Sequence, residues 1–139
     1  EGIQFRDLPD PEGETGALLA FFMPTQESAA ALGEKLGCGV IAKSGWHVYS
    51  NMEQLLGKMT PDALQCPFTC PYYKGPEPTY ERGMLPQTDD LLKRAINISV
   101  GVVDAGLGSS YGINIKSTPE EIDEVAANLR AAIIECLDQ

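Results

Sequence analysis

The stretch from residue 16 to residue 37, GALLAFFMPTQESAAALGEKLG, predicts a buried strand followed directly by a helix. Residues 16–23 form an unbroken apolar run that is short for a helix and ends at Pro24, which is typical of a strand buried on both faces. Thr25 then offers a helix N-cap, apolar residues recur at helical spacing, and Gly37 is a suitable C-terminal stop. This order indicates a domain in which helices pack against a sheet.

A second helix is predicted near the C-terminus. Thr118 provides an N-cap, Pro119 occupies the first helical position, and Glu121 completes a capping box. Apolar residues then follow at the spacing of one helical face: Ile122, Val125, Ala126, Leu129, Ala132, Ile133 and Cys136. We expect this face to pack on the sheet.

Shorter patterns predict the remaining elements. Apolar alternation or short apolar runs indicate strands at residues 3–5, 38–42, 98–102 and 113–115, and a capped apolar stripe indicates a helix at residues 88–96. The prediction is therefore an α+β fold, with a small mixed or antiparallel sheet covered by helices. We expect one domain over residues 1–139, with residues 1–15 as a connecting segment that contains a turn.

Composition and charge bound the classes of function. The chain has 139 residues, which suits one domain with a hydrophobic core. Its formal net charge of −10 repels phosphate backbones, so we expect no nucleic-acid partner. No segment approaches the roughly 20 consecutive apolar residues of a membrane helix, and no signal segment opens the chain, so we expect a cytoplasmic protein without membrane contact. The first residue is Glu1 rather than methionine, which indicates a processed product or an excised fragment.

The cysteines do not predict a metal centre. Cys66 and Cys70 have a spacing near that of a zinc knuckle, but no second Cys/His pair follows, and the single histidine, His47, lies far upstream. We therefore predict no metal site, reduced thiols, and a core position for Cys136. A redox or metal protein built on Cys66 and Cys70 is the least favoured alternative.

The order of local motifs resembles the small C-terminal domain of DegT-type (DegT/DnrJ/StrS) sugar aminotransferases, which are fold-type-I enzymes that use pyridoxal 5′-phosphate. The matching segments cover nearly the whole chain: Arg6 in a short strand, the turn at residues 10–14, the strand and helix at residues 16–36, LGCGVIAKSGWHVYSN at residues 36–51, LPQTDDLLKRAINISV at residues 85–100 and TPEEIDEVAANLRAAI at residues 118–133. The chain departs from the family pattern in two places. Ile98 to Val100 replace the usual proline after the middle helix, and the added segment GLGSSYGINIKS precedes the last one.

The resemblance implies a large domain on the same polypeptide, absent from this chain, that holds the pyridoxal phosphate and the Schiff-base lysine. It implies a homodimeric enzyme that transfers an amino group from glutamate to a keto-sugar or sugar nucleotide. We assign no catalytic residue to this chain, because none of its lysines lies in a context that resembles the Schiff-base motif. Alone, it is expected to bind no cofactor and to be inactive. The alternative is a free-standing α+β module that binds a small molecule or regulates a partner.

By resemblance, the loop at residues 44–51, SGWHVYSN, faces the mouth of the active site. His47, Tyr49 and Asn51 alternate, so in an extended segment they would point to one side and offer hydrogen bonds to sugar hydroxyls or a carboxylate. They are the first predicted substrate contacts. In the alternative interpretation, His47 and Trp46 merely anchor the loop by packing.

A second candidate region is the long proline-rich and tyrosine-rich loop at residues 61–87, since loops of this length are usually functional or disordered. Tyr80 and Arg82, with Tyr72 and Tyr73, could stack on a sugar or nucleotide or contact a diphosphate. Equally, they could bury against the large domain or the dimer mate, and we favour this contact with protein for the loop as a whole. Tyr80 and Arg82 complete the predicted substrate contacts.

Overall fold

The computed structural model describes residues 2–45, 47–66, 68, 71–100, 113–114 and 116–138. The chain forms two compact units. The first, here called the sheet unit, comprises Glu1–Ser44 and Asp90–Gln139, and the second, the loop unit, comprises Gly45–Asp89. The loop unit is thus an insertion in the sequence of the sheet unit, and each unit is described by itself below.

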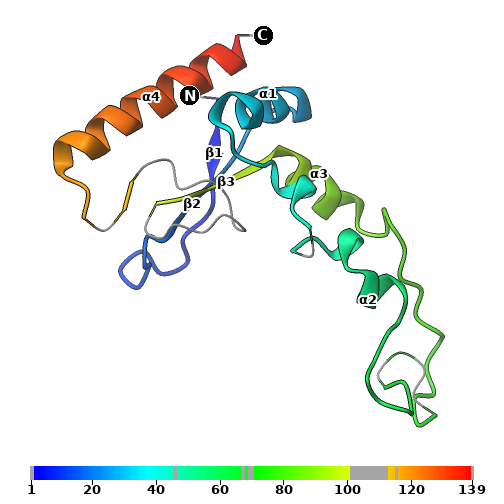
Figure 1. Cartoon of the computed structure of the whole chain (residues 1–139). Helices are drawn as coiled ribbons and strands as arrows, with labels where there is room; N and C mark the ends of the chain where they lie inside the picture. The colour runs from blue at the N-terminus through cyan, green and yellow to red at the C-terminus, as the bar shows by residue number, and fades with distance from the viewer. Residues whose placement is uncertain are drawn as a thin grey trace. The chain divides into compact units, whose positions relative to one another are not determined.

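The sheet unit contains an antiparallel sheet of three strands in the order β1-β2-β3 (Figure 1). The strands are β1 (Gln4–Phe5), β2 (Leu18–Phe22) and β3 (Ala95–Ser99). The described part of the chain also has helices α1 (Gln26–Leu36), α2 (Glu53–Leu56), α3 (Pro86–Arg94) and α4 (Pro119–Leu137), with 3-10 turns η1 (Ile41–Lys43) and η2 (Tyr49–Asn51). The predicted α+β class is confirmed.

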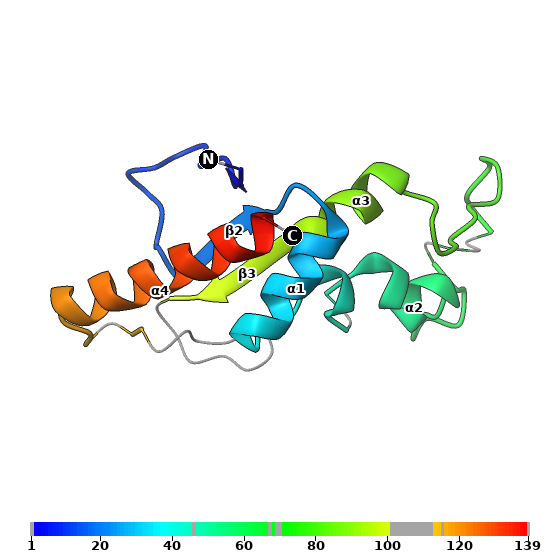
Figure 2. The ribbon, with the colours of Figure 1, turned by 90° about the horizontal axis from the view of Figure 1, so that it is seen from above.

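The hydrophobic core lies between the sheet and two helices. Helices α1 and α4 lie over the same face of the sheet, as Figures 1 and 2 show, and Lys35 of α1 forms an ion pair with Glu135 of α4. The core residues come from the strands, both helices and the segment after α1: Phe21, Met23, Ala29, Leu32, Cys38, Val40, Ile96, Ile98, Ala132 and Cys136. Leu19 and Phe21 of β2, and Met23 directly after the strand, alternate toward this core, since side chains along a strand alternate between the two faces.

The predicted helix ends are confirmed in both long helices. In α1, the Thr25 hydroxyl accepts a hydrogen bond from the Ser28 amide at 3.1 Å, and Gly37 ends the helix at φ 64°, a left-handed conformation that glycine adopts without strain. In α4, the Glu121 carboxylate accepts from the Thr118 amide at 2.8 Å, which closes the capping box. These local signals fix where each helix begins or ends.

The expected apolar face of α4 packs only in part. Ala132 and Cys136 are buried against α1 and the sheet, whereas Ile122 near the start of the helix is 42% exposed. The expectation that β2 is buried on both faces is also wrong. Only Phe21 of its residues is fully buried, because α1 and α4 lie over one face of the sheet. No helix in the described part of the chain is long and apolar enough to span a membrane.

One predicted strand is absent, and one predicted helix has different bounds. The segment at residues 38–42 is no strand; it contributes a single bridge from Val40 to Ile96 and then turns into η1, where the Lys43 amide donates to the Val40 carbonyl at 2.9 Å. The helix expected at residues 88–96 begins earlier, at Pro86, and ends at Arg94. Ile96 belongs to β3 because it pairs with Phe21 in the centre of the sheet. This pairing across the sheet overrides the local helical pattern.

Parts of two further predictions lie outside the described residues. The strand expected at residues 98–102 begins earlier, at Ala95, and its last two positions are not described. In the strand expected at residues 113–115, Ile113 and Asn114 have no strand structure, and Ile115 is not described. The segment at residues 1–15 contains β1 and a turn in which the Asp10 carboxylate accepts from the Gly13 amide at 3.2 Å.

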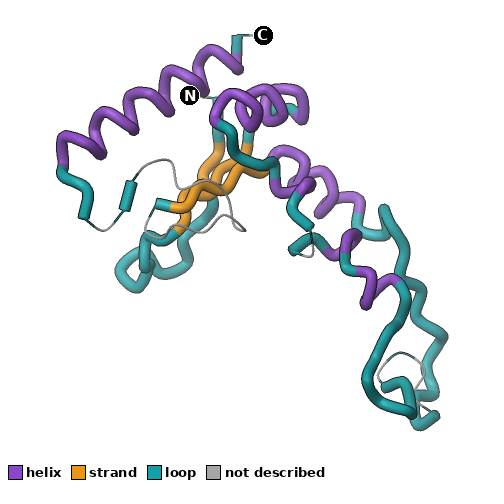
Figure 3. The backbone as a smooth tube through the Cα atoms, in the orientation of Figure 1, coloured by secondary structure: helices purple, strands orange, loops and turns teal. Residues whose placement is uncertain are grey.

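The loop unit differs from the sheet unit in secondary structure and burial. Its described residues form η2, α2, the first turn of α3 and otherwise irregular chain, which Figure 3 draws as loop. Val48, at 2% exposure, is the one fully buried side chain among the described residues of this unit.

Candidate functional site

All the predicted substrate contacts lie in the loop unit: His47, Tyr49, Asn51, Tyr80 and Arg82. His47 and Arg82 are exposed to solvent, and Tyr49, Asn51 and Tyr80 are half-buried. The structure therefore keeps these residues in one unit, although they come from two regions about thirty positions apart in the sequence.

The extended geometry expected for residues 47–51 is wrong. The segment turns into η2, with the Asn51 amide donating to the Val48 carbonyl at 2.8 Å and the Met52 amide donating to the Tyr49 carbonyl at 3.1 Å. A 3-10 helix has about three residues per turn, so residues two apart no longer share a face. The turn forms around Val48, whose buried side chain anchors the segment.

Tyr49 connects the two regions of the loop unit. Its hydroxyl donates to the Asp89 carboxylate at 3.0 Å and accepts from the Leu85 amide at 3.2 Å. Because the hydroxyl proton is committed to Asp89, the side chain acts as a clamp between η2 and the start of α3. We therefore assign Tyr49 a positioning role in the site.

Asn51 and Arg82 are predicted as separate site residues, and the structure brings them into contact. Arg82 Nη1 donates to the side-chain oxygen of Asn51 at 3.0 Å. Gly83 follows with φ 84°, a conformation that strains other residues, so the turn directly after Arg82 depends on glycine. The contact joins η2 to this turn.

The aromatic residues of the long loop divide into two groups. Tyr80 packs edge-to-face on Phe68, with ring centroids 5.4 Å apart. Tyr72 is 79% exposed and Tyr73 is also exposed, as are Met59 and Leu64. Tyr80 thus stabilises the loop, whereas the second group presents apolar surface to solvent.

Two ion pairs between neighbouring segments shift carboxyl pKa values. Lys58 Nζ lies 2.9 Å from Glu77 Oε1 in the loop unit, and this hydrogen bond lowers the pKa of the Glu77 carboxyl. In the sheet unit, Arg6 lies 2.8 Å from Glu14 and lowers the pKa of that carboxyl in the same way. Arg6 therefore makes a structural ion pair.

The described cysteines form no disulfide with one another. Cys38 and Cys136 are buried in the core, Cys66 is half-buried, and Cys70 lies outside the described residues. Burial raises the pKa of the Cys38 thiol, which keeps it in the unreactive protonated form. Within the part of the chain that the structure describes, no cluster of three or more His, Cys, Asp or Glu side chains is arranged to hold a metal ion.

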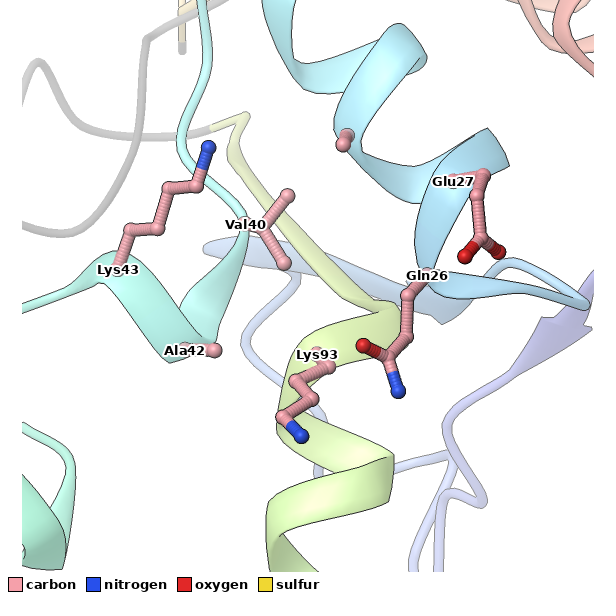
Figure 4. A pocket seen from close by; sticks show the side chains of 7 residues that line it. Gln26, Glu27, Val40, Ala42, Lys43 and Lys93 are labelled. Atoms are coloured by element: carbon pink, nitrogen blue, oxygen red, sulfur yellow. The ribbon is translucent and has the colours of Figure 1, made fainter.

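Sequence reasoning missed a shallow pocket in the sheet unit. Its volume is about 290 Å³, and it is lined by the first turn of α1, the η1 segment and one residue of α3: Gln26, Glu27, Ala30, Val40, Ala42, Lys43 and Lys93 (Figure 4). The two lysines lie on opposite sides of the pocket, and their ammonium groups point away from each other (Figure 4). No local motif signals this pocket, because its walls come from three separate segments.

No protein-family model matches the chain. A functional assignment therefore depends on the ordered local motifs and on the geometry of the two units.

Proposed function

We propose that this chain is the small C-terminal domain of a DegT-type, pyridoxal-phosphate-dependent sugar aminotransferase. The order of its local motifs supports the proposal, and so does the α+β architecture closed by a capped terminal helix. The observation that carries the proposal is the way in which the loop unit is held together. This unit keeps a defined set of polar contacts although only Val48 is fully buried among its described residues.

The exposed apolar side chains of the loop unit favour contact with a second protein body. Met59 is 63% exposed, and Leu64, Tyr72 and Tyr73 are exposed in the same unit. Large apolar side chains left exposed in this way are typical of surfaces that contact other proteins. In the proposed enzyme this surface packs against the large domain or the dimer mate, and the enzyme acts in the cytoplasm as a homodimer.

The described residues of this chain do not themselves fit the cofactor. Lys35 and Lys58 are paired with Glu135 and Glu77, and the pocket that Lys43 and Lys93 line is open and shallow. Pyridoxal phosphate requires an enclosed lysine and groups for its phosphate and ring nitrogen. We therefore place the cofactor and its chemistry, the exchange of an amino group between glutamate and a keto-sugar, on the large domain.

The contribution of this chain is to bind and orient the substrate. The exposed His47 offers a ring nitrogen to a sugar hydroxyl, and the Tyr49 clamp fixes the neighbouring turn η2. Arg82, held by Asn51, is a further candidate for substrate contact. Tyr80 stabilises the loop before Arg82 by edge-to-face aromatic packing. Holding a reactant in the correct geometry removes a large part of a reaction barrier.

Expression of the parent open reading frame tests the proposal. The parent protein should bind pyridoxal phosphate and convert glutamate and a keto-sugar nucleotide into 2-oxoglutarate and an amino-sugar nucleotide, whereas the isolated chain should do neither. A parent protein that contains no pyridoxal-binding domain would refute the assignment and favour the free-standing binding module.

Variants of the active parent then test the loop unit. His47→Ala should raise the KM for the keto-sugar by about tenfold, which is the effect of losing one hydrogen bond to a polar group. Gln54→Ala is the matched control, because Gln54 is an exposed residue of the same unit on α2. Unchanged kinetics in His47→Ala would remove His47 from the site.

A further inference from the structure

Arg82 is held in place by a neutral partner. Its Nη1 atom donates to Asn51 Oδ1 at 3.0 Å, and no carboxylate of the described residues lies within ion-pair distance of it. In contrast, Arg6 and Arg94 contact Glu14 and Asp90 at 2.8 and 2.9 Å.

Both members of this pair sit on backbone that further contacts hold in the folded state. Asn51 lies in η2, which is anchored by the buried Val48. Arg82 precedes the turn at Gly83, and the Tyr49 hydroxyl holds the chain just beyond that turn through the Leu85 amide. The guanidinium is therefore oriented before any ligand arrives, which lowers the entropy cost of binding.

Most of the hydrogen-bonding capacity of Arg82 remains available. A guanidinium carries five N–H donors in a planar fork, and Asn51 accepts one of them. Because Arg82 is exposed, the other donors face solvent. The planar fork matches the two oxygens of a carboxylate or phosphate.

We propose that Arg82, positioned by Asn51, binds an oxyanion of the substrate. Arg82 contacts the anion, and Asn51 acts as a positioning residue that orients the guanidinium without neutralising it. The identity of the anion rests on the proposed function: it is either the diphosphate of a sugar nucleotide or a carboxylate of the amino donor. Both present the same paired oxygens to the guanidinium.

Asn51→Asp separates this role from a purely structural one. The substitution has nearly the same shape, and it converts the contact into a charge-assisted hydrogen bond, so the tie between η2 and Arg82 is kept or strengthened. The added carboxylate neutralises Arg82, however, and competes with an incoming anion. Arg82→Gln removes both the tie and the charge.

The test is an anion titration of the 139-residue chain at low salt, followed by NMR of the Arg82 and Asn51 resonances. Inorganic pyrophosphate and glutamate are used separately, and the tighter of the two identifies the source of the oxyanion. We expect saturable binding to the wild type and a Kd weakened by about tenfold or more in Asn51→Asp and Arg82→Gln, from loss of a charge-assisted contact. Arg130→Gln, at an exposed arginine of α4, should keep the wild-type Kd.

Hydrogen exchange of the η2 backbone amides completes the test. The protection of these amides should persist in Asn51→Asp, which keeps the contact between residues 51 and 82, and should fall in Arg82→Gln, which removes it. The proposal is overturned if the wild type binds neither anion saturably, or if Asn51→Asp binds as tightly as the wild type.

The titration does not depend on a pyridoxal enzyme. A parent protein without aminotransferase activity would overturn the proposed function and leave the oxyanion site standing. Conversely, an active parent whose Asn51→Asp and Arg82→Gln variants keep the wild-type KM for both substrates would overturn the oxyanion site and leave the aminotransferase.

Discussion

In the sheet unit, Phe21, Leu32 and Ile96 have at most 1% of their surface exposed, and they come from two strands and a helix that pack together. In the loop unit, Val48 alone is comparably buried among the described residues. That unit relies instead on directed contacts, such as the Tyr49 clamp and the Asn51–Arg82 hydrogen bond.

This difference in burial separates the sheet unit, which supplies the stability, from the loop unit, which we expect to bind the substrate. Hydrophobic burial is the dominant favourable term in folding, whereas single polar contacts add only about 1 kcal/mol each. Regions with few buried apolar contacts open at lower free energy than the core. We therefore expect the sheet unit to unfold cooperatively and the loop unit to open locally at lower cost.

The largest expected effect lies in the sheet unit. Ile96→Ala should lower the free energy of unfolding by about 2–5 kcal/mol, because it leaves a cavity in the core between the sheet and the helices. Urea denaturation measures this change. Leu64→Ala, at an exposed residue of the loop unit, is the control and should change it by less than about 0.5 kcal/mol. Equal losses in the two variants would contradict the division into a core and an exposed unit.

A smaller and local effect is expected at Val48. Val48→Ala should lower the free energy of local opening in the loop unit by about 1–3 kcal/mol, since it removes the buried part of the one anchoring side chain. Hydrogen exchange at the Asn51 and Met52 amides, which bond to the carbonyls of Val48 and Tyr49, measures the opening. The urea midpoint of the sheet unit should move little. If it fell as far as in Ile96→Ala, the two units would unfold as one.

The smallest effect is the dependence on pH. The pKa of Glu77 is lowered by its hydrogen bond from Lys58, and that of Glu14 by its hydrogen bond from Arg6. A carboxyl with a lowered pKa in the folded state adds stability above its unfolded pKa, and this stability is lost as the pH falls through the folded pKa.

We therefore expect a slight destabilisation on acidification from about pH 5 to pH 3. Both carboxylates are exposed, so the change is small and screened by salt. NMR titration gives each pKa directly. Glu77→Gln should remove the part of the pH-dependent stability that comes from the loop unit. A Glu77 carboxyl that titrates at or above its ordinary pKa would show that the ion pair does not persist.

Much of the fold could be predicted where short-range chemistry decides it. Thr25, Gly37 and Thr118 define helix ends through contacts with residues a few positions away, so the sequence reveals them. The border between α3 and β3 could not be predicted in this way. Ile96 continues the helical pattern, but its pairing with Phe21 makes it a strand residue.

The candidate site shows the same limit. The sequence identified the residue types, and the structure keeps His47, Tyr49 and Arg82 in one unit. The turn at η2 and the partners of Tyr49 could not be read from alternation, because they depend on contacts between distant parts of the chain. The pocket of Figure 4 was missed for the same reason.

The division of the sheet unit between the two ends of the sequence has a consequence for biosynthesis. β2 and α1 leave the ribosome long before β3 and α4, so the nascent chain displays Phe21 and Leu32 while the intervening segment is still being translated. Contacts between distant positions also slow folding. Phe21 and Leu32 therefore cannot be buried as in the folded protein until β3 and α4 have also been translated.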